Sequence, residues 1–460
     1  MTLPRLPLVS FVVVNHNYGR FLPELVNAIR AQSYPEIECI LVDDASTDDS
    51  IQVITRLIAE DPALRLVALR HNVGQSLASM AGWEAARGAY VAFLDADDLI
   101  LPDYAATHVY VHMSSRRHVA LTSCDMFQAL DGRAVVATGE ALNGYFAAHG
   151  SAGAEWFRPV DVTGGLWPLG LPGDDVLRHV AYVPPSHSRW CWSPTSGNVY
   201  RRDALEVLVG MAGLDHLRMT TDVLFCAGTN CISGSLLIDR PLAVYRLHGD
   251  NLATVRSQLD NVRVMRAGSE CSQQALRLLI AHFLSEAERI VPRFWHAASY
   301  VEAVESLGRT LGEGGDPNFL PAAILQYGEA LTAAMGQDTL SAWMRRHELI
   351  VEAKPEPVLS ALSEPSGTPT DSVPYVSTEL ASLPELPAQP EASEPMALTV
   401  ASAHPDVSDP AIPSALSTEQ KSSVARHENH GVLHRFAEQI RRLVGSRSSY
   451  AAKTIEDVVR

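Results

Sequence analysis

Short apolar runs alternate with amphipathic segments along about the first hundred residues of the chain. The runs cover residues 8–14, 37–42, 66–69 and 90–94, and apolar positions recur at helical spacing over residues 22–32, 46–60 and 75–87. Runs of this length, bounded by polar turns, are typical of buried strands, and the spacing between them predicts helices. Strands that alternate with helices predict an α/β fold with a mostly parallel sheet covered by helices on both faces.

The run at 90–94 ends in three carboxylates, Asp95, Asp97 and Asp98. Residues i and i+2 of an extended backbone point to the same side, so Asp95 and Asp97 can face one site together. Open α/β sheets bind their ligands at this carboxyl edge. Two adjacent carboxylates repel each other unless a positive charge lies there. Because Mg²⁺ is typically held by one or two carboxylates and substrate phosphates, the pattern predicts a divalent cation shared with a phosphorylated ligand.

The Asp-x-Asp pattern has three other interpretations. A calcium-binding EF-hand loop is excluded, because Ile100 stands where the loop needs glycine and Ala106 where it needs the closing glutamate. A phosphatase with an aspartate nucleophile usually continues with Gly-Thr, whereas Asp98 and Leu99 follow here. A solvated acidic strand end without chemistry remains open on these residues alone.

The polar turn after the first strand, residues 15–20, lacks the sequence Gly-x-Gly-x-x-Gly. Without that glycine-rich backbone, a dinucleotide cofactor is not expected here. A nucleotidyltransferase also uses an α/β sheet with paired aspartates, but it normally carries a basic, glycine-rich loop at this position. A sheet that binds phosphates with carboxylates needs a metal ion instead of a glycine cradle.

Five segments of the chain together resemble glycosyltransferase family 2, the inverting enzymes with a GT-A fold. They are residues 9–22, 31–35, 40–48, 71–74 and 86–98, in the order and spacing of the family. Two positions depart from the usual pattern, since His16 replaces a tyrosine and Ala81 lies near a frequent asparagine. The resemblance implies a Rossmann-like mixed sheet flanked by helices over residues 1–256.

The resemblance also implies a site for a nucleotide sugar, expected here to be a UDP-sugar. Val14, His16 and Asn17 would line the base. Asp44 would accept a hydrogen bond from the base ring. From the local sequence alone, Asp43 and Asp44 have an equally good explanation as residues that cap a helix N-terminus and compensate its dipole.

The same resemblance assigns the metal site. Asp95 would lie near the ribose and the metal, and Asp97 would bind Mg²⁺ or Mn²⁺ on the diphosphate. Residues 239–251 resemble the segment that closes the family's catalytic domain. There, His248 would complete the metal shell and Arg246 would meet the diphosphate, with a structural role as the alternative for the histidine. Because Lys and Arg are sparse near these motifs, the metal would stabilise most of the leaving group's charge.

An inverting transfer needs a base that removes the proton of the acceptor hydroxyl, on the side opposite the leaving diphosphate. The family places this carboxylate at the start of a helix, and Asp222 matches that place. Thr221 stands where the family usually has an acid, and Asp222 also fits a structural role at a helix start. Asp215, and Asp174 or Asp175, are the other candidates.

The acceptor side is expected between residues 122 and 202. Residues 122–183 are rich in Gly, Trp and Pro and predict loops and short strands. Residues 188–202 resemble the family's acceptor segment, a Ser-Gly-Asn turn that leads into a strand. Trp190 and Trp192 point to the same side of an extended chain, where they would contact a glycan or lipid-linked acceptor. Core aromatics are the equally weighted alternative.

The pattern changes after residue 256. Residues 257–352 show helical periodicity and predict an accessory helical domain for packing, dimerisation or acceptor contact. Residues 353–425 are dominated by Pro, Ser, Ala and Glu and are expected to be a disordered linker. Residues 426–460 contain an amphipathic segment with arginines beside its apolar face, which predicts a helix that contacts an anionic membrane or a partner.

The composition limits the partners and the compartment. The 460 residues carry a formal net charge of -17 with a pI near 5.4, which argues against nucleic-acid binding. Six scattered cysteines without a paired Cys-x-x-Cys framework predict free thiols in a reducing compartment rather than a zinc site. The N-terminus lacks the features of a signal peptide, and no apolar run has membrane-spanning length. A cytoplasmic protein is expected, and peripheral contact with the inner membrane face through the C-terminal helix and a homodimer are open alternatives.

Together these motifs predict a metal-dependent inverting glycosyltransferase of polysaccharide biosynthesis. It would move a sugar from a UDP-sugar to a hydroxyl group of a glycan, lipid-linked or protein acceptor. Two alternatives stay open, a catalytically inactive sugar-nucleotide-binding or scaffold module and, second, a nucleotidyltransferase.

Overall fold

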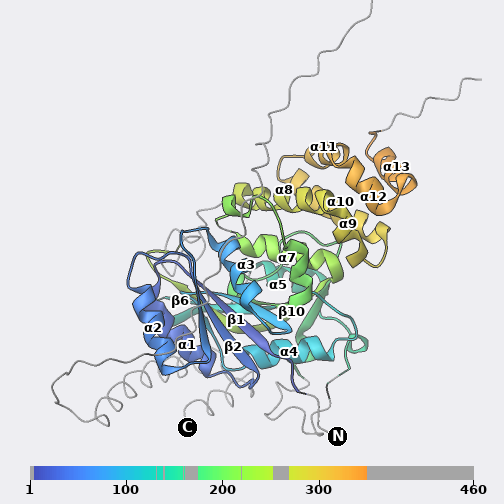
Figure 1. The fold of residues 1–460 in the computed structure, drawn as a ribbon. Coiled ribbons are helices and arrows are strands. Elements are labelled where there is room, and N and C mark those ends of the chain that lie inside the picture. The colour runs from blue at the N-terminus through green and yellow to red at the C-terminus, as the bar shows by residue number, and fades with distance from the viewer. Residues whose placement is uncertain are drawn as a thin grey trace, which may run out of the picture.

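The computed structural model describes residues 5–130, 132–137, 140–158, 160, 175–218, 220–251 and 269–349. Over these residues, helices cover both faces of a mixed sheet, and a group of C-terminal helices packs against one side (Figure 1). The expected fold class, a GT-A-like α/β sheet followed by a helical region, is confirmed. The predicted linker at 353–425 and the predicted terminal helix at 426–460 lie outside the described residues.

The first half of the sheet forms from the elements that the apolar pattern predicts. Its strands are β1 (Val9–Asn15), β2 (Ile37–Asp43), β3 (Leu64–Ala68) and β4 (Tyr90–Asp95), and its helices are α1 (Leu22–Arg30), α2 (Ser50–Glu60) and α3 (Gln75–Ala85). The four strands run parallel in the order β3-β2-β1-β4. Side chains of β1 alternate between the faces, so that Val12 packs in the cluster that includes α3 and Val13 in the cluster that includes α1 and α2.

One predicted helix start is wrong. Helix α2 begins at Ser50 rather than after Ser46, and Oδ1 of Asp48 accepts a hydrogen bond from the backbone N of Ser50 at 3.0 Å. The hydroxyl of Ser46 instead accepts hydrogen bonds from Nδ2 of Asn15 at 3.1 Å and from the backbone N of Asn17 at 3.0 Å. The loop after β2 is therefore fastened to the turn after β1.

The second half of the sheet adds antiparallel pairing. β9 (Asn198–Arg201) lies antiparallel to β4 and to β6 (Leu121–Leu130), which pairs in turn with β7 (Arg133–Ala137). β10 (Ser235–Leu247) runs parallel to β6 and antiparallel to β5 (Leu99–Ile100) and β8 (Val180–Val183). The helices of this half are α4 (Tyr104–Ser114), α5 (Glu140–His149), α6 (Arg202–Leu205) and α7 (Thr221–Ser233).

The expectation of loops and short strands over 122–183 is wrong for β6, which is a strand of 10 residues. All of its residues except Leu130 are buried. A strand that is covered on both faces lacks the alternation of apolar and polar positions by which a half-buried strand is recognised. The predicted turn at Ser196–Asn198 and the strand that follows it are present as expected.

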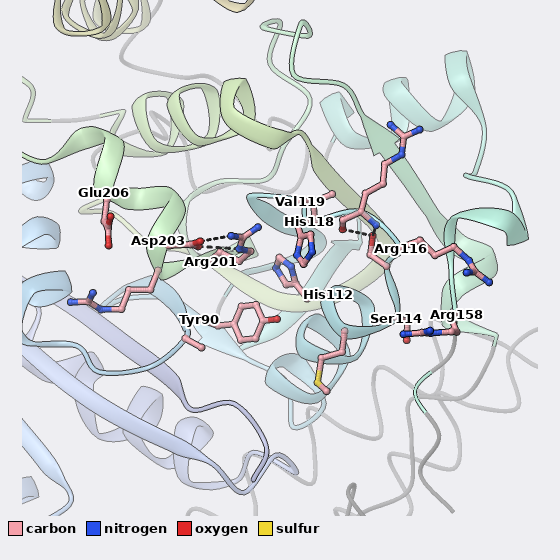
Figure 2. Close-up of a pocket in the computed structure, with 15 residues that line it drawn as sticks. Tyr90, His112, Ser114, Arg116, His118, Val119, Arg158, Arg201, Asp203 and Glu206 are labelled. Atoms are coloured by element: carbon pink, nitrogen blue, oxygen red, sulfur yellow. Dashed lines mark hydrogen bonds and ion pairs between the residues drawn. The ribbon is translucent and has the colours of Figure 1, made fainter. Parts of the chain in front are cut away.

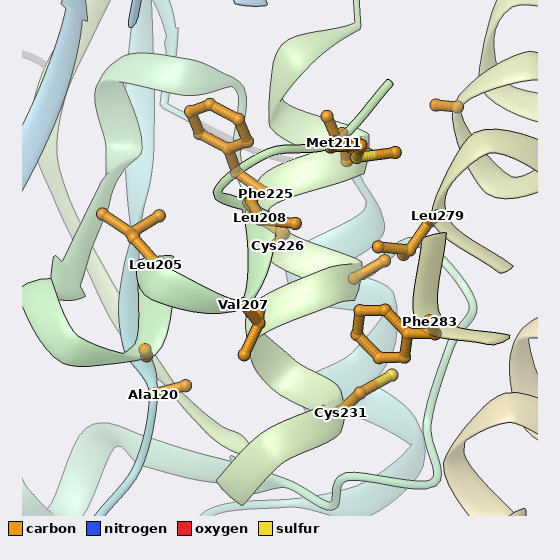
Figure 3. Close-up of a cluster of buried hydrophobic side chains, with 14 of the residues drawn as sticks. Ala120, Leu205, Val207, Leu208, Met211, Phe225, Cys226, Cys231, Leu279 and Phe283 are labelled. Carbon is orange, nitrogen blue, oxygen red and sulfur yellow. The ribbon is translucent and has the colours of Figure 1, made fainter. Parts of the chain in front are cut away.

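The C-terminal helices share a core with the sheet. They are α8 (Ser269–Ser285), α9 (Ala287–Ile290), α10 (Ala297–Glu313), α11 (Phe319–Gln326), α12 (Gly328–Met335) and α13 (Gln337–Arg346). Figure 3 shows Phe225 and Cys226 of α7 in one buried cluster with Leu279 and Phe283 of α8. Among the described residues, no helix combines the length and the apolar character needed to traverse a bilayer.

Replacing Phe283 with alanine should lower the free energy of unfolding by about 3–5 kcal/mol, because the ring is fully buried. Since the cluster spans α7 and α8, denaturant unfolding followed by circular dichroism and by fluorescence should show one shifted transition. Leu325→Ala, at a side chain that is 53% exposed, is the control and should change this free energy by less than about 0.5 kcal/mol. A separate early transition would show that the helices unfold alone.

Candidate active site

The carboxyl ends of β1, β2 and β4 bring several predicted site residues to one edge of the sheet. In the parallel registers, Val14 of β1 lies beside Asp95 of β4, and Asn15 lies beside Asp43 of β2. Nδ2 of Asn15 donates a hydrogen bond to Oδ1 of Asp43 at 2.9 Å. This edge is where open α/β sheets bind their ligands.

Asp97, the predicted metal ligand, lies beside the predicted second ligand His248. Oδ2 of Asp97 is 2.9 Å from Nε2 of His248 and accepts a longer hydrogen bond from Nδ2 of Asn251 at 3.4 Å. The imidazole packs against the rings of Tyr18 and Phe21, with centroid separations of 5.5 and 4.8 Å. The structure therefore brings both predicted ligands together and fixes the orientation of the histidine.

Asp95 and Asp98 form an acidic cluster with Asp97. Oδ1 of Asp95 accepts a hydrogen bond from Nε2 of Gln75 at 2.6 Å. Oδ1 of Asp98 accepts one from the backbone N of Arg246 at 3.3 Å. Both donors are neutral groups, so neither contact balances the charge of the carboxylate that it binds.

Burial, together with charge repulsion, raises the pKa values of two members of the acidic cluster. Burial, and then the charges of Asp97 and Asp222, raise the pKa of Asp95 to about 7. Burial, and then Asp97 and Asp95, raise the pKa of Asp98 well above its usual value. A raised pKa means that the ionised form of the carboxyl group is disfavoured in its surroundings. A nearby cation would stabilise the ionised form and lower the pKa again.

Arg246, expected to meet the diphosphate, lies at this edge but is already held by other groups. Its guanidinium donates to the backbone carbonyls of Asp97 and Asp98 and forms an ion pair with Glu24. It also lies 4.6 Å over the ring of Phe21. The charge of Arg246 is thus shared with Glu24 and does not act on the acidic cluster alone.

The donor groups at this edge fit a divalent cation that is completed by its substrate. Within the part of the chain that the structure describes, no three His, Cys, Asp or Glu side chains are grouped as a closed metal cage. Mg²⁺ is usually held by one or two protein ligands together with substrate phosphates, so a closed cage is not required. Asp97 and His248 are two such donors beside unbalanced negative charge.

Asp222, the predicted base, lies in the first turn of α7, and its charge acts on Asp95 of the acidic cluster. Oγ1 of Thr221 donates to Oε1 of Gln75 at 3.1 Å, and Gln75 in turn binds Asp95. This chain of hydrogen bonds ties the start of α7 to the end of β4. Burial raises the pKa of Asp222 to about 6.

The other base candidates are placed differently. Asp215 is exposed and has His216 as its neighbour, at 3.7 Å. Asp175 is exposed and pairs with Arg240 at 2.9 Å, and Asp174 lies outside the described residues. Asp222 is the described candidate whose charge acts on the acidic cluster.

Asp44 is the residue predicted to bind the nucleotide base. Both of its carboxylate oxygens accept hydrogen bonds from the backbone. They accept hydrogen bonds from the N–H groups of Val73 at 2.7 Å and Gly74 at 2.9 Å, just before α3. Oδ2 of Asp43 accepts one from the backbone N of Ser46 at 3.0 Å. These contacts hold the turns before α2 and α3, and neither helix start has a side-chain capping bond. Recognition of a nucleotide base by Asp44 stays a prediction.

His16 and Asn17 build the turn between β1 and α1. Nδ1 of His16 lies 2.7 Å from the carbonyl oxygen of Asp44. Asn17 has a φ of 62°, in the left-handed region that asparagine tolerates. Its Oδ1 accepts from the backbone N of Thr47 at 2.7 Å and of Asp48 at 3.2 Å. Contact of these residues with a base stays a prediction.

The shared exposed face predicted for Trp190 and Trp192 is wrong. Trp192 is 2% exposed and its Nε1 donates to Oγ of Ser235 at 2.8 Å, whereas Trp190 is 37% exposed. The two rings meet edge to face at 5.9 Å. Segment 190–192 is not a strand, so its side chains do not alternate as in an extended chain, and Trp192 turns into the core.

The sequence interpretation missed Gln75 and Asn251. Gln75 opens α3 and bridges Asp95 to Thr221, although it stands next to the recognised segment 71–74. Asn251 accepts a hydrogen bond from the backbone N of His248 at 2.6 Å. The available signal was that Gln75 directly follows the matched segment 71–74 and that Asn251 ends the matched segment 239–251.

Known proteins resemble parts of the chain. Residues 10–150 match the family described as glycosyl transferase family 2. An uncharacterized glycosyltransferase of Nostoc sp. is 28% identical over 271 residues, which are 58% of this chain and 73% of that protein. The succinoglycan biosynthesis protein ExoO of Rhizobium meliloti is 32% identical over 139 residues, 30% of this chain and 39% of ExoO. Among solved structures, TarS of S. aureus in complex with UDP-GlcNAc gives a TM-score of 0.41 and 16% identity, covering 74% of this chain and 92% of that one.

Proposed function

We propose that the chain, whose residues 10–150 match glycosyl transferase family 2, transfers a sugar with inversion from a nucleoside-diphosphate donor, first of all a UDP-sugar, to an acceptor hydroxyl. The observation that carries the proposal is the position of Asp222, tied through Thr221 and Gln75 to Asp95. The charge of Asp222 also acts on Asp95, which supports a base near carboxylates suited to a cation and a diphosphate. Inverting transfer needs these two functions at one site.

In the proposed reaction, ionised Asp222 takes the proton of the acceptor hydroxyl while that oxygen attacks the anomeric carbon. The bond from the anomeric carbon to the diphosphate oxygen breaks, and the diphosphate leaves with the electron pair on the opposite face. A pKa near 6 suits this role, because Asp222 is then mostly ionised at neutral pH but more basic than an ordinary carboxylate. Thr221 and Gln75 hold the start of α7 in place.

Asp97 and His248 would hold Mg²⁺ or Mn²⁺, with Asp95 beside them. The ion, when bound, supplies Lewis-acid stabilisation of the charge on the leaving diphosphate. Asn251 supports both protein ligands, since its Nδ2 donates to Asp97 and its Oδ1 accepts from the backbone of His248.

For the acceptor, we propose a growing polysaccharide, free or lipid-linked, because the relative ExoO is named for succinoglycan biosynthesis. The segment around Trp190 leads into Ser196, whose Oγ accepts a hydrogen bond from the backbone N of Asp95 at 3.1 Å. Trp190 is part-exposed and offers a ring on which a sugar could stack. Trp192 has no part in this proposal.

Thermal stabilisation by UDP tests the donor site. UDP with Mn²⁺ should raise the melting temperature, and a ligand at 100 times its Kd corresponds to about 2.7 kcal/mol of stabilisation. EDTA should remove the shift, because the acidic cluster repels a bare diphosphate. GDP and Mn²⁺ provide the matched comparison of bases. A shift by UDP that is indifferent to the cation would refute the metal assignment, and no shift with any nucleoside diphosphate would favour an inactive scaffold.

A further inference from the structure

A cavity of about 780 Å³ lies at the end of the sheet opposite to the acidic cluster. Tyr90, which starts β4, lines the cavity, whereas Asp95 ends the same strand. Neither the acidic cluster nor Asp222 contributes to its lining. The volume is in the range of small-molecule sites, so the cavity is a second site candidate, separate from the proposed active site.

The two acidic residues of the lining already have partners. Asp203 forms an ion pair with Arg201, which is also in the lining. Glu206 pairs with Arg293, from outside the cavity, at 2.7 Å. Figure 2 shows Asp203 and Arg201 joined on one side of the cavity, while Arg116 and Arg158 stand on the other.

The wall opposite this pair is built by two short backbone segments. The backbone N of Arg116 donates to the carbonyl of Trp156 at 2.9 Å, and that of Arg158 donates to the carbonyl of Ser114 at 2.7 Å. Because side chains alternate along such an antiparallel pairing, Arg116 and Arg158 lie on one side, and the buried Phe157 lies on the other. The backbone therefore presents both arginines to the same space.

We call Arg116, Arg117 and Arg158 the arginine wall. Within the described residues, none of the three pairs with a carboxylate. Nε of Arg116 donates to the carbonyl of Phe157 at 3.3 Å, and the guanidinium of Arg117 lies 4.1 Å over the ring of Trp156. The wall is a local excess of positive charge in a chain whose net charge is -17. Such a charge must be balanced by solvent ions or by an anionic ligand.

We propose that this cavity binds a phosphate-bearing ligand, a phosphate monoester or diester that is anchored by the arginine wall. The planar guanidinium group matches phosphate oxygens in a bidentate manner and does not lose its charge. Tyr90 and His118 in the same lining supply further hydrogen-bond donors. The ligand can be a small sugar or polyol phosphate or the headgroup of an anionic lipid, which present the same chemistry.

The test compares the full chain with the double variant Arg116→Ala/Arg158→Ala. Binding of glycerol 3-phosphate is measured by calorimetry in EDTA, and binding to phosphatidylcholine vesicles with and without phosphatidylglycerol is measured by sedimentation. Arg56→Ala/Arg345→Ala removes two exposed arginines elsewhere and is the matched control. The single variant Arg158→Ala, at an exposed residue, serves if the double variant does not fold.

The double variant should weaken binding of one probe by about 10–100-fold, because two charge-assisted contacts are lost, and the control should bind like the wild type. A loss confined to glycerol 3-phosphate identifies a soluble phosphate as the ligand. A loss confined to phosphatidylglycerol vesicles identifies a lipid headgroup. Unchanged binding of both probes in the folded variant, or no binding of either probe by the wild type, overturns the proposal.

Discussion

Changing Asp222 to asparagine should reduce sugar transfer by about 10²–10⁴-fold without loss of the fold. Asparagine keeps the size of the side chain but cannot take the acceptor's proton. Burial raises the pKa of Asp222 to about 6, so the ionised form is disfavoured in the folded protein. The folded state therefore loses stability as the pH rises from the ordinary range of a carboxylate to about 6. At pH 8 the neutral variant should melt at or above the temperature of the wild type.

The matched control for this prediction is Asp215→Asn, at an exposed carboxylate that was a rival candidate for the base. It should release UDP from the donor at the rate of the wild type. In the wild type, kcat/KM should rise with pH and level off above about 6, as Asp222 becomes ionised. If Asp222→Asn keeps full activity while Asp215→Asn loses it, the base has been assigned to the wrong residue.

Periodicity predicted the first half of the sheet because each element there has one clear pattern. Helix α1, for example, buries Leu22, Leu25, Val26 and Ile29 on one face and leaves polar residues on the other. Helix α4 and strand β6 lack such a pattern, since nearly every residue of both is buried. Where all sides of an element are covered, the order of apolar residues carries little information on its period.

The resemblance to the family named residues that the structure brings to one edge of the sheet, but not what each one contacts. Asp97 and His248 are 151 positions apart in the chain and meet at 2.9 Å because β4 and β10 belong to one sheet. Both carboxylate oxygens of Asp44 accept hydrogen bonds from backbone N–H groups, and these bonds depend on the path of the turn before α3. Likewise, the arginine wall keeps its positive charge because Asp203 and Glu206, the acidic residues of the lining, pair with Arg201 and Arg293. Composition does not disclose these pairings.

Asp97→Asn should change the melting temperature in opposite directions relative to the wild type without metal and with metal and UDP. Without metal, the charge of Asp97 adds to burial in raising the pKa values of Asp95 and Asp98, so its removal should leave the melting temperature equal or higher. With Mn²⁺ and UDP, the wild type should gain stability and the variant should gain little. Transfer should fall by about 10³-fold, because stabilisation of the leaving group by a bound cation is worth several kcal/mol.

Asp250→Asn is the control that separates this effect from a general loss of negative charge. Asp250 is two residues from His248 and pairs at the surface with Arg20 at 2.7 Å, so it belongs to the same end of the sheet but not to the acidic cluster. This variant should follow the wild type both in EDTA and in Mn²⁺ with UDP. Differential scanning fluorimetry of the three proteins under both conditions decides the matter. If Asp97→Asn keeps the stabilisation by Mn²⁺ and UDP, the cation is held by other groups; if all three proteins respond alike, charge at position 97 has no part in binding it.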